Sequence, residues 1–226
     1  MSYKFQPTLV SDLEKLLERL ITEEGDYPWH YEIKKNIAYN MQYLEYLAHT
    51  LSDESPIQLT DVVKKLTIRS FIITGMGIVE GLLYYILRKR NLHKKKKEDL
   101  IADNIKAEFK PVKNTGRKYY IKSQIFKILE GDEQTEDEMS LDSMLKRAEK
   151  YKILGEDNEI YRKLNYLRKL RNTVHIQLIE KKLDTHYNQF NDKELNIMKK
   201  ILYSLLDKVG ILETFSSSKK TFSYLK

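Results

Sequence analysis

The chain has 226 residues, of which 41% are hydrophobic, a formal net charge of +7 and no cysteine. This composition supports a folded core of about one domain and argues against a wholly disordered chain. The lack of cysteine excludes structural disulfides and thiolate metal sites. The 8 glycines and 4 prolines are too few for a fold with many strands and turns. We therefore expect an all-α protein.

The positive charge is concentrated in one run. Residues 88–97 hold seven Lys or Arg side chains and no acid, so the remaining chain is neutral. Such a run attracts phosphate backbones or anionic lipid, although most runs of this kind are solvated loops. A second run, over 130–138, holds six carboxylates and indicates an exposed connector. The candidate nucleic-acid-binding residues are Arg88, Lys89, Arg90, Lys94, Lys95, Lys96 and Lys97.

Helical periodicity predicts three elements in the first part of the chain. Ser11 and Glu14 form a capping-box pattern before a helix over about 11–24, a second helix covers 30–52, and a third covers 60–92. The third helix is apolar nearly all round, as expected of an element that packs on several sides.

The most apolar stretch, residues 71–87, lies within this third helix. It is interrupted by Glu80 and three glycines, and its 17 residues are short for a membrane span of about 20. We expect a buried central helix and no membrane partner. The first residues lead into charged helical sequence without a secretory signal, so we expect a cytoplasmic protein.

Residues 93–138 are polar and charged, and we expect an irregular connector there, with a short helix or strand near 119–126. Ser140 begins a further helix that Gly155 closes. The last two helices are expected over 157–181 and from Asp192 onward. Together these elements predict one all-α domain of six or seven helices over 1–215, with a helical N-terminal part over 1–55 and a flexible tail over 216–226.

The helix over 157–181 carries the most specific pattern. Its apolar positions recur every three or four residues, and Arg171 takes a place in this seam where an apolar residue belongs. Arg168 and His175 fall on one shoulder of the same face, and Asn172 lies about 100° round from Arg171. Two guanidinium groups and an imidazole therefore converge beside an apolar stripe, which consists of Ile160, Leu164, Leu167, Val174 and Leu178.

An arginine in an apolar seam requires an anionic partner. Glu80 is a candidate supporting residue because it lies in register with the apolar positions of the central helix. Arg69 falls on the same face about three turns earlier. We expect Glu80 to pair with Arg69 or Arg171. Spacing alone leaves a structural ion pair and a functional site as equal alternatives.

Residues 167–176, LRKLRNTVHI, resemble the signature helix of the HEPN superfamily (higher eukaryotes and prokaryotes nucleotide-binding domains). That motif is an Arg, commonly followed by a polar residue such as Asn, and then a His after four to six intervening residues. Arg168 and His175 enclose six residues. Arg171 and Asn172 match the Arg-Asn pair, but only three residues separate Arg171 from His175. Both assignments stay open. In layout the resemblance extends over about 58–210.

The resemblance implies an HEPN-like helical bundle, usually dimeric, in which two motif helices face each other. Many members are metal-independent endoribonucleases of toxin–antitoxin or other defence systems. In that chemistry His175 would move protons, Arg168 or Arg171 would bind the phosphate, and Asn172 would orient the phosphate or His175. The RNA 2′-hydroxyl would be the nucleophile, so no metal or cofactor is expected.

The expected partners are RNA, a second copy of the chain, and an antitoxin or other protein. Gly77 and Gly81 are expected to let two central helices approach each other near the two-fold axis. The alternative is a non-catalytic HEPN-like module that binds a partner protein, a nucleotide or RNA.

Overall fold

The structure is a computed structural model that describes residues 5–18, 20–21, 29–95, 97–109, 119–130, 138–172, 186–208 and 222–225. The chain divides into two compact units. One comprises residues 1–91 and 140–226, and the other comprises residues 92–139. The first unit is helical and the second is a β-hairpin.

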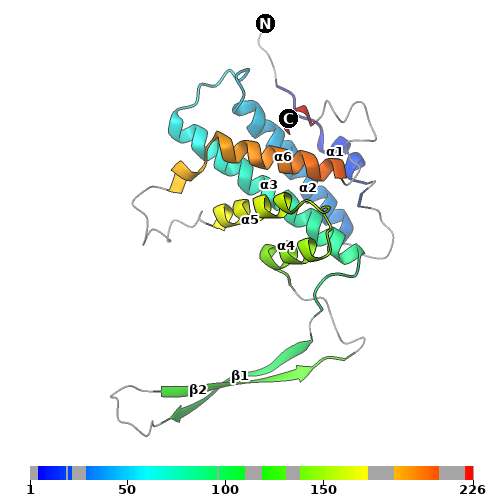
Figure 1. Cartoon of the computed structure of the whole chain (residues 1–226), viewed down its shortest axis with the longest axis vertical. Coiled ribbons are helices and arrows are strands. Elements are labelled where there is room, and N and C mark those ends of the chain that lie inside the picture. Colours follow the sequence, from blue (N-terminus) through cyan, green and yellow to red (C-terminus); the bar gives the residue numbers. More distant parts are fainter. Residues whose placement is uncertain are drawn as a thin grey trace. The chain divides into compact units, whose positions relative to one another are not determined.

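Six α-helices of the described residues form the first unit (Figure 1). The mostly helical character expected from composition is thereby confirmed. The helices are α1 (Val10–Leu17), α2 (Trp29–Thr50), α3 (Asp61–Lys89), α4 (Leu141–Lys150), α5 (Asn158–Asn172) and α6 (Asp192–Lys208), with 3-10 turns η3 (His186–Gln189) and η4 (Ser223–Leu225).

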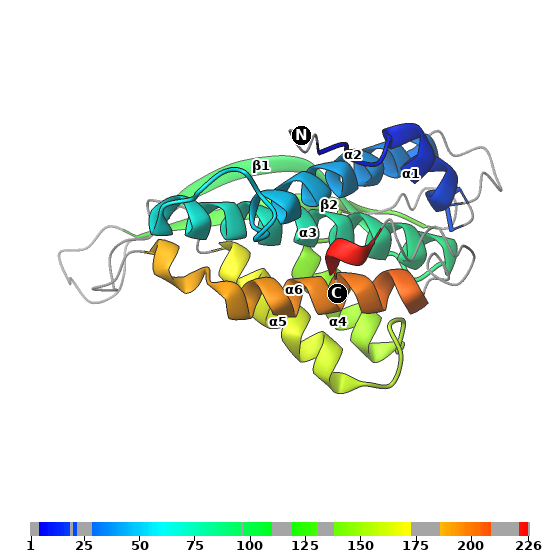
Figure 2. The same cartoon turned by 90° about the horizontal axis from the view of Figure 1, so that it is seen from above.

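α3 lies at the centre of the helical unit, with α2 on one side and α4, α5 and α6 on the other (Figure 2). The Thr60 hydroxyl caps its first turn by accepting a hydrogen bond from the Val63 N–H at 3.4 Å. Within the described residues, α3 is the one helix long and apolar enough to cross a membrane, and 61% of its most apolar window is buried inside the protein. Neighbouring helices therefore cover the apolar stretch.

Two glycines of α3 permit close helix packing within the chain. A Cβ atom at Gly75 would lie 3.0 Å from the Met198 side chain of α6, and one at Gly81 would lie 3.3 Å from Ile37 of α2. A Cβ atom at Gly77 would meet no atom of the described residues within 4 Å. The expectation that Gly81 serves a contact between two copies is therefore corrected, because it faces α2, whereas Gly77 is open.

A short connection fixes α4 against α5. The Ser140 hydroxyl caps α4 by accepting a hydrogen bond from the Ser143 N–H at 3.3 Å. Gly155 follows α4 with φ of 94°, a left-handed conformation that favours glycine. The Tyr161 hydroxyl accepts from the Leu154 N–H at 2.9 Å and donates to the Gly155 carbonyl at 3.0 Å. These bonds set the direction in which α5 leaves the turn.

The second unit corrects the expectation of an irregular connector over 93–138, because it contains a two-stranded β-hairpin. Strands β1 (Glu98–Phe109) and β2 (Tyr119–Ile128) pair in antiparallel fashion, with Leu100 opposite Phe126. The register shifts between Leu100 and Ala102 and again before Ile105. Each shift interrupts the two-residue alternation by which a strand is recognised in sequence. The pattern therefore looked irregular although the backbone is extended.

The C-terminal segment also differs from the expected flexible tail. Phe222 and Leu225 are buried, and η4 packs against α6 and α2. The Tyr224 hydroxyl donates to the Met41 carbonyl at 3.5 Å. Apolar burial anchors this segment to the helical unit. Residues 216–221 and Lys226 lie outside the described residues.

Candidate functional site

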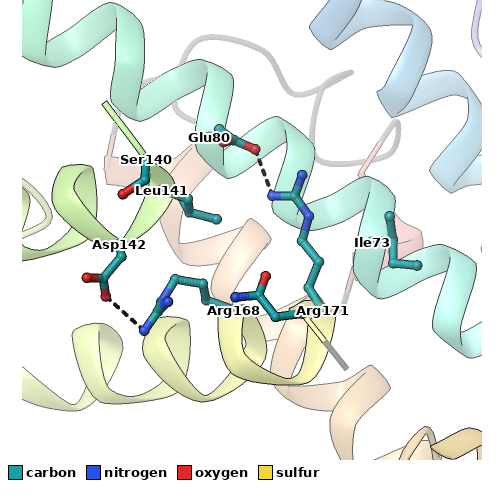
Figure 3. A pocket seen from close by; sticks show the side chains of 8 residues that line it. Ile73, Glu80, Ser140, Leu141, Asp142, Arg168 and Arg171 are labelled. Carbon is teal, nitrogen blue, oxygen red and sulfur yellow. Dashed lines mark hydrogen bonds and ion pairs between the residues drawn. The ribbon is translucent and has the colours of Figure 1, made fainter. Parts of the chain in front are cut away.

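The site begins on α5, whose inner face is apolar. The seam predicted from spacing is confirmed as far as the structure describes it, since Ile160, Leu164 and Leu167 are buried. Arg171 continues this seam one turn beyond Leu167 and remains half-buried. Its side chain therefore extends along the interface between α5 and α3 (Figure 3).

Arg171 pairs with Glu80 of α3. Its Nη1 atom lies 2.7 Å from Glu80 Oε2, and the two side chains are 32% and 35% exposed. The prediction that Glu80 has an arginine partner is confirmed, and the partner is Arg171. Arg69 precedes Glu80 by eleven residues, or roughly 16 Å along a helix, and it does not line the pocket described below.

Arg168 pairs with Asp142, a residue that sequence reasoning missed. Arg168 Nη2 lies 2.8 Å from Asp142 Oδ1 in the first turn of α4. Lys146 Nζ lies 2.7 Å from the other carboxylate oxygen, Oδ2. The hydrogen bond from Lys146, together with the Arg168 charge, lowers the pKa of Asp142 below its ordinary value. Asp142 is thus an ionised carboxylate that bridges two cations.

Arg168 is more enclosed than Arg171. Its side chain is 18% exposed, and within the described residues its buried Nε–H has no hydrogen-bond acceptor. An unpaired buried donor costs free energy of about 1–3 kcal/mol. Arg168 therefore has a hydrogen-bonding capacity that Asp142 does not fill.

These residues enclose a pocket of about 470 Å³ between α3, α4 and α5 (Figure 3). Two arginines and two carboxylates contribute charges that sum to zero. The N-terminus of α4 adds a partial positive charge. The pocket can accept a group with anionic oxygens if one guanidinium turns toward it. The lining residues are Ile73, Glu80, Ser140, Leu141, Asp142, Arg168, Arg171 and Asn172.

The predicted proton-transfer residue, His175, lies outside the described residues, as do Val174 and Leu178. The structure brings together Arg168, Arg171 and Asn172, and His175 follows Asn172 by three positions in the chain. The relation of His175 to the pocket therefore stays a prediction.

The basic run divides between the two units. Arg88 packs over the Tyr84 ring with its Cζ atom 5.0 Å from the ring centroid, whereas Lys94, Lys95 and Lys97 belong to the hairpin unit. The Lys97 carbonyl accepts a hydrogen bond from the Leu129 N–H at 2.8 Å, at the base of the hairpin. The predicted basic patch is therefore not one continuous surface of one unit. Lys96 lies outside the described residues.

A second polar pair joins α5 to α6, away from the pocket. The Tyr166 hydroxyl donates to Glu194 Oε1 at 2.8 Å, and Glu194 is 4% exposed. Burial of the hydroxyl and the neighbouring carboxylate raise the pKa of Tyr166 to about 12. Neither residue lines the pocket, so we assign this pair to helix packing.

In the described part of the chain, no group of three or more His, Cys, Asp or Glu side chains is arranged to hold a metal ion. Comparison with family models, with curated proteins and with solved structures finds no match.

Proposed function

We propose that the chain is a metal-independent endoribonuclease of the HEPN type that cleaves RNA through attack by the RNA 2′-hydroxyl. One observation carries the proposal. Arg168, Arg171 and Asn172, three predicted site residues that precede His175 in the chain by three to seven positions, line one pocket of about 470 Å³. Guanidinium groups bind phosphate oxygens through paired, charge-assisted hydrogen bonds. The pocket therefore offers the donors that phosphodiester cleavage requires.

Each residue has a distinct task in this proposal. An arginine stabilises the additional negative charge that develops on the phosphate in the transition state. His175 accepts the 2′-hydroxyl proton or protonates the leaving 5′-oxygen, since an ordinary imidazole titrates near pH 6.5. Asn172 orients the phosphate or His175. The reaction leaves a 2′,3′-cyclic phosphate and a 5′-hydroxyl.

We further propose that the active form is a homodimer. Cleavage requires one proton to leave the nucleophile and another to reach the leaving group, and a second copy supplies a second imidazole. Gly77 lies between Ile73 and Glu80 in helical register, and no described residue would contact a Cβ atom there. This face of α3 leaves room for a neighbouring helix.

The proposal includes a cytoplasmic protein that acts in a toxin–antitoxin or other defence system, with an antitoxin or another protein as a candidate partner. Most of the apolar window of α3 is buried inside the protein, which supports a protein without a membrane partner. Of the two parts of the basic run, Lys94 to Lys97 would guide RNA through a salt-sensitive field.

A second candidate function is a non-catalytic module that binds a protein or nucleotide. One observation favours it: Glu80 and Asp142 already neutralise Arg171 and Arg168. A pocket of zero net charge attracts an RNA backbone less than a pocket with two free arginines. Under this alternative the four side chains hold helices together.

Incubation of the purified protein with total RNA tests the proposal. We expect cleavage in the presence of EDTA, 2′,3′-cyclic phosphate ends by mass spectrometry, and a loss of roughly 100-fold or more in His175→Ala. His186→Ala is the matched control and should retain activity. Wild-type protein that binds RNA and leaves it intact would favour the non-catalytic module.

A further inference from the structure

The carboxylate partners of the two pocket arginines differ in whether they contact a second cation. Asp142 holds Arg168 through Oδ1 at 2.8 Å and Lys146 through Oδ2 at 2.7 Å. If Arg168 turns away, Asp142 keeps a cation. Lys146 is 71% exposed and reaches Asp142 from the next turn of α4, so this pairing does not depend on α5.

Among the described residues, Glu80 has no such second partner. Within the described part of the chain, Arg171 is the cation within ion-pair distance of Glu80. Of the side chains one turn away from Glu80 on α3, Met76 and Leu83 are buried and offer no donor. The Tyr84 hydroxyl, also one turn away, accepts a hydrogen bond from Arg88 Nη1. Release of Arg171 would leave a half-buried carboxylate without a counter-charge among the described residues, which is unfavourable although solvent screens part of the cost.

The pairing with Asp142 leaves one donor of Arg168 unsatisfied among the described residues. Its contact with Asp142 uses Nη2, while the adjacent Nε–H is buried and has no acceptor in the described residues. Asp142 does not fill both donors because Lys146 engages its other oxygen. A phosphate presents several oxygens and can accept from Nε and Nη2 together.

We infer that Arg168 is the arginine that exchanges from Asp142 onto a phosphate, and that Arg171 is a positioning residue held by Glu80. The inference rests on the proposed function in that it takes an RNA phosphate as the ligand. In the free protein Asp142 forms an ion pair with Arg168, and the phosphate replaces Asp142 when RNA binds. The ion pair with Lys146 keeps the Asp142 charge neutralised during this exchange. The exchange assigns separate roles to two arginines that the sequence motif leaves equivalent.

Binding of a non-cleavable RNA tests the exchange. The probe is a short fluorescein-labelled RNA with 2′-O-methyl groups at every position, followed by fluorescence anisotropy, so that the measurement does not depend on cleavage. We expect Arg168→Gln to weaken binding by roughly tenfold. We expect Asp142→Asn to tighten binding, and this gain should disappear in the Arg168→Gln background. The matched controls are Arg162→Gln, an 80% exposed arginine of α5, and Asp12→Asn in the first turn of α1; both should bind as wild type.

Thermal unfolding without RNA tests the division of roles independently. Arg171→Gln should lower the melting temperature, and Glu80→Gln in the same chain should restore most of the loss, because it removes the unpaired charge. Arg168→Gln should melt close to wild type, because Asp142 keeps Lys146. A large loss of stability in Arg168→Gln, or binding that depends on Arg171 alone, would overturn the inference.

The two proposals fail in different ways. If all proteins bind the methylated RNA as expected and neither the wild-type protein nor any variant cleaves normal RNA, the exchange holds and the ribonuclease proposal fails. If normal RNA is cleaved while Arg168→Gln binds and cleaves as wild type, the ribonuclease proposal holds and the exchange is wrong. Wild-type protein without measurable affinity for the methylated RNA would overturn the exchange.

Discussion

Arg171 Nη1 and Glu80 Oε2 lie 2.7 Å apart and connect the end of α5 to the middle of α3. The pair places a cation and a carboxylate at one wall of the pocket. Because both side chains are about one-third exposed, solvent screens part of their attraction.

Glu80→Ala should therefore destabilise the protein moderately. We expect a loss of about 1 kcal/mol in the free energy of unfolding, since the substitution leaves Arg171 without its partner in a half-buried position. Urea unfolding gives this value. Glu159→Ala is the control, because Glu159 pairs with Lys163 on the surface of α5 and should contribute less than about 0.5 kcal/mol. Equal losses in the two variants would show that the Glu80–Arg171 pair contributes no more stability than a surface ion pair.

Ser140→Ala should weaken α4 and alter the pocket edge. The Ser140 hydroxyl is the N-cap of α4 and lines the pocket. Loss of an N-cap side chain costs about 1 kcal/mol, and urea unfolding should show this decrease. Ser140→Asp restores a cap and should recover the stability. No recovery by aspartate would contradict the capping role.

The dimer proposal predicts a specific effect at Gly77. Because a Cβ atom at this position meets nothing within 4 Å in the part of the chain that the structure describes, Gly77→Leu should leave the melting temperature of a single copy nearly unchanged. In a dimer that packs on this face of α3, the larger side chain should weaken association by tenfold or more, roughly 1.4 kcal/mol. Sedimentation equilibrium of both proteins at micromolar concentration makes the comparison. A dimer of unchanged affinity would place the interface elsewhere.

Stability at high pH should depend on Tyr166. The pKa of this hydroxyl is raised from 10.0 to about 12 by burial and by Glu194, so the folded chain holds the proton more tightly than the unfolded chain. The stabilisation is present below pH 10 and is lost as the pH rises toward 12. The decrease in unfolding free energy over this range should be smaller in Tyr166→Phe. An identical pH profile in the two proteins would show that Tyr166 ionises equally in both states.

Local signals were sufficient to predict the helices that build the site. Ser140 and Gly155 mark the start of α4 and the turn after it, and the structure uses both residues in those roles. The apolar spacing of α5 is also a local signal, and it correctly predicted that Arg171 lies at a helix interface. At α1 the local signal was misleading, since the helix begins at Val10 and Leu9 precedes it without a side-chain cap. The predicted capping box from Ser11 therefore does not start this helix.

Features that depend on contacts between distant segments were not predictable in the same way. Asp142 is a first-turn acid, a common feature of helix N-termini, and only the packing of α4 against α5 brings it to Arg168. The hairpin was missed because its register shifts near Ala102 break the alternation of apolar residues. The first case depends on a partner 26 positions away in the chain, and the second on a local break in the alternation.

A crystal structure of the protein with a 2′-O-methylated RNA dinucleotide tests the central claim most directly. The account predicts the bridging phosphate in the pocket between α3, α4 and α5, with its oxygens about 3 Å from Arg168 Nε and Nη2. Asp142 should then contact Lys146 alone, and Arg171 should remain on Glu80. A phosphate bound at another surface, with Arg168 still paired to Asp142, would contradict the claim that this pocket binds the scissile phosphate.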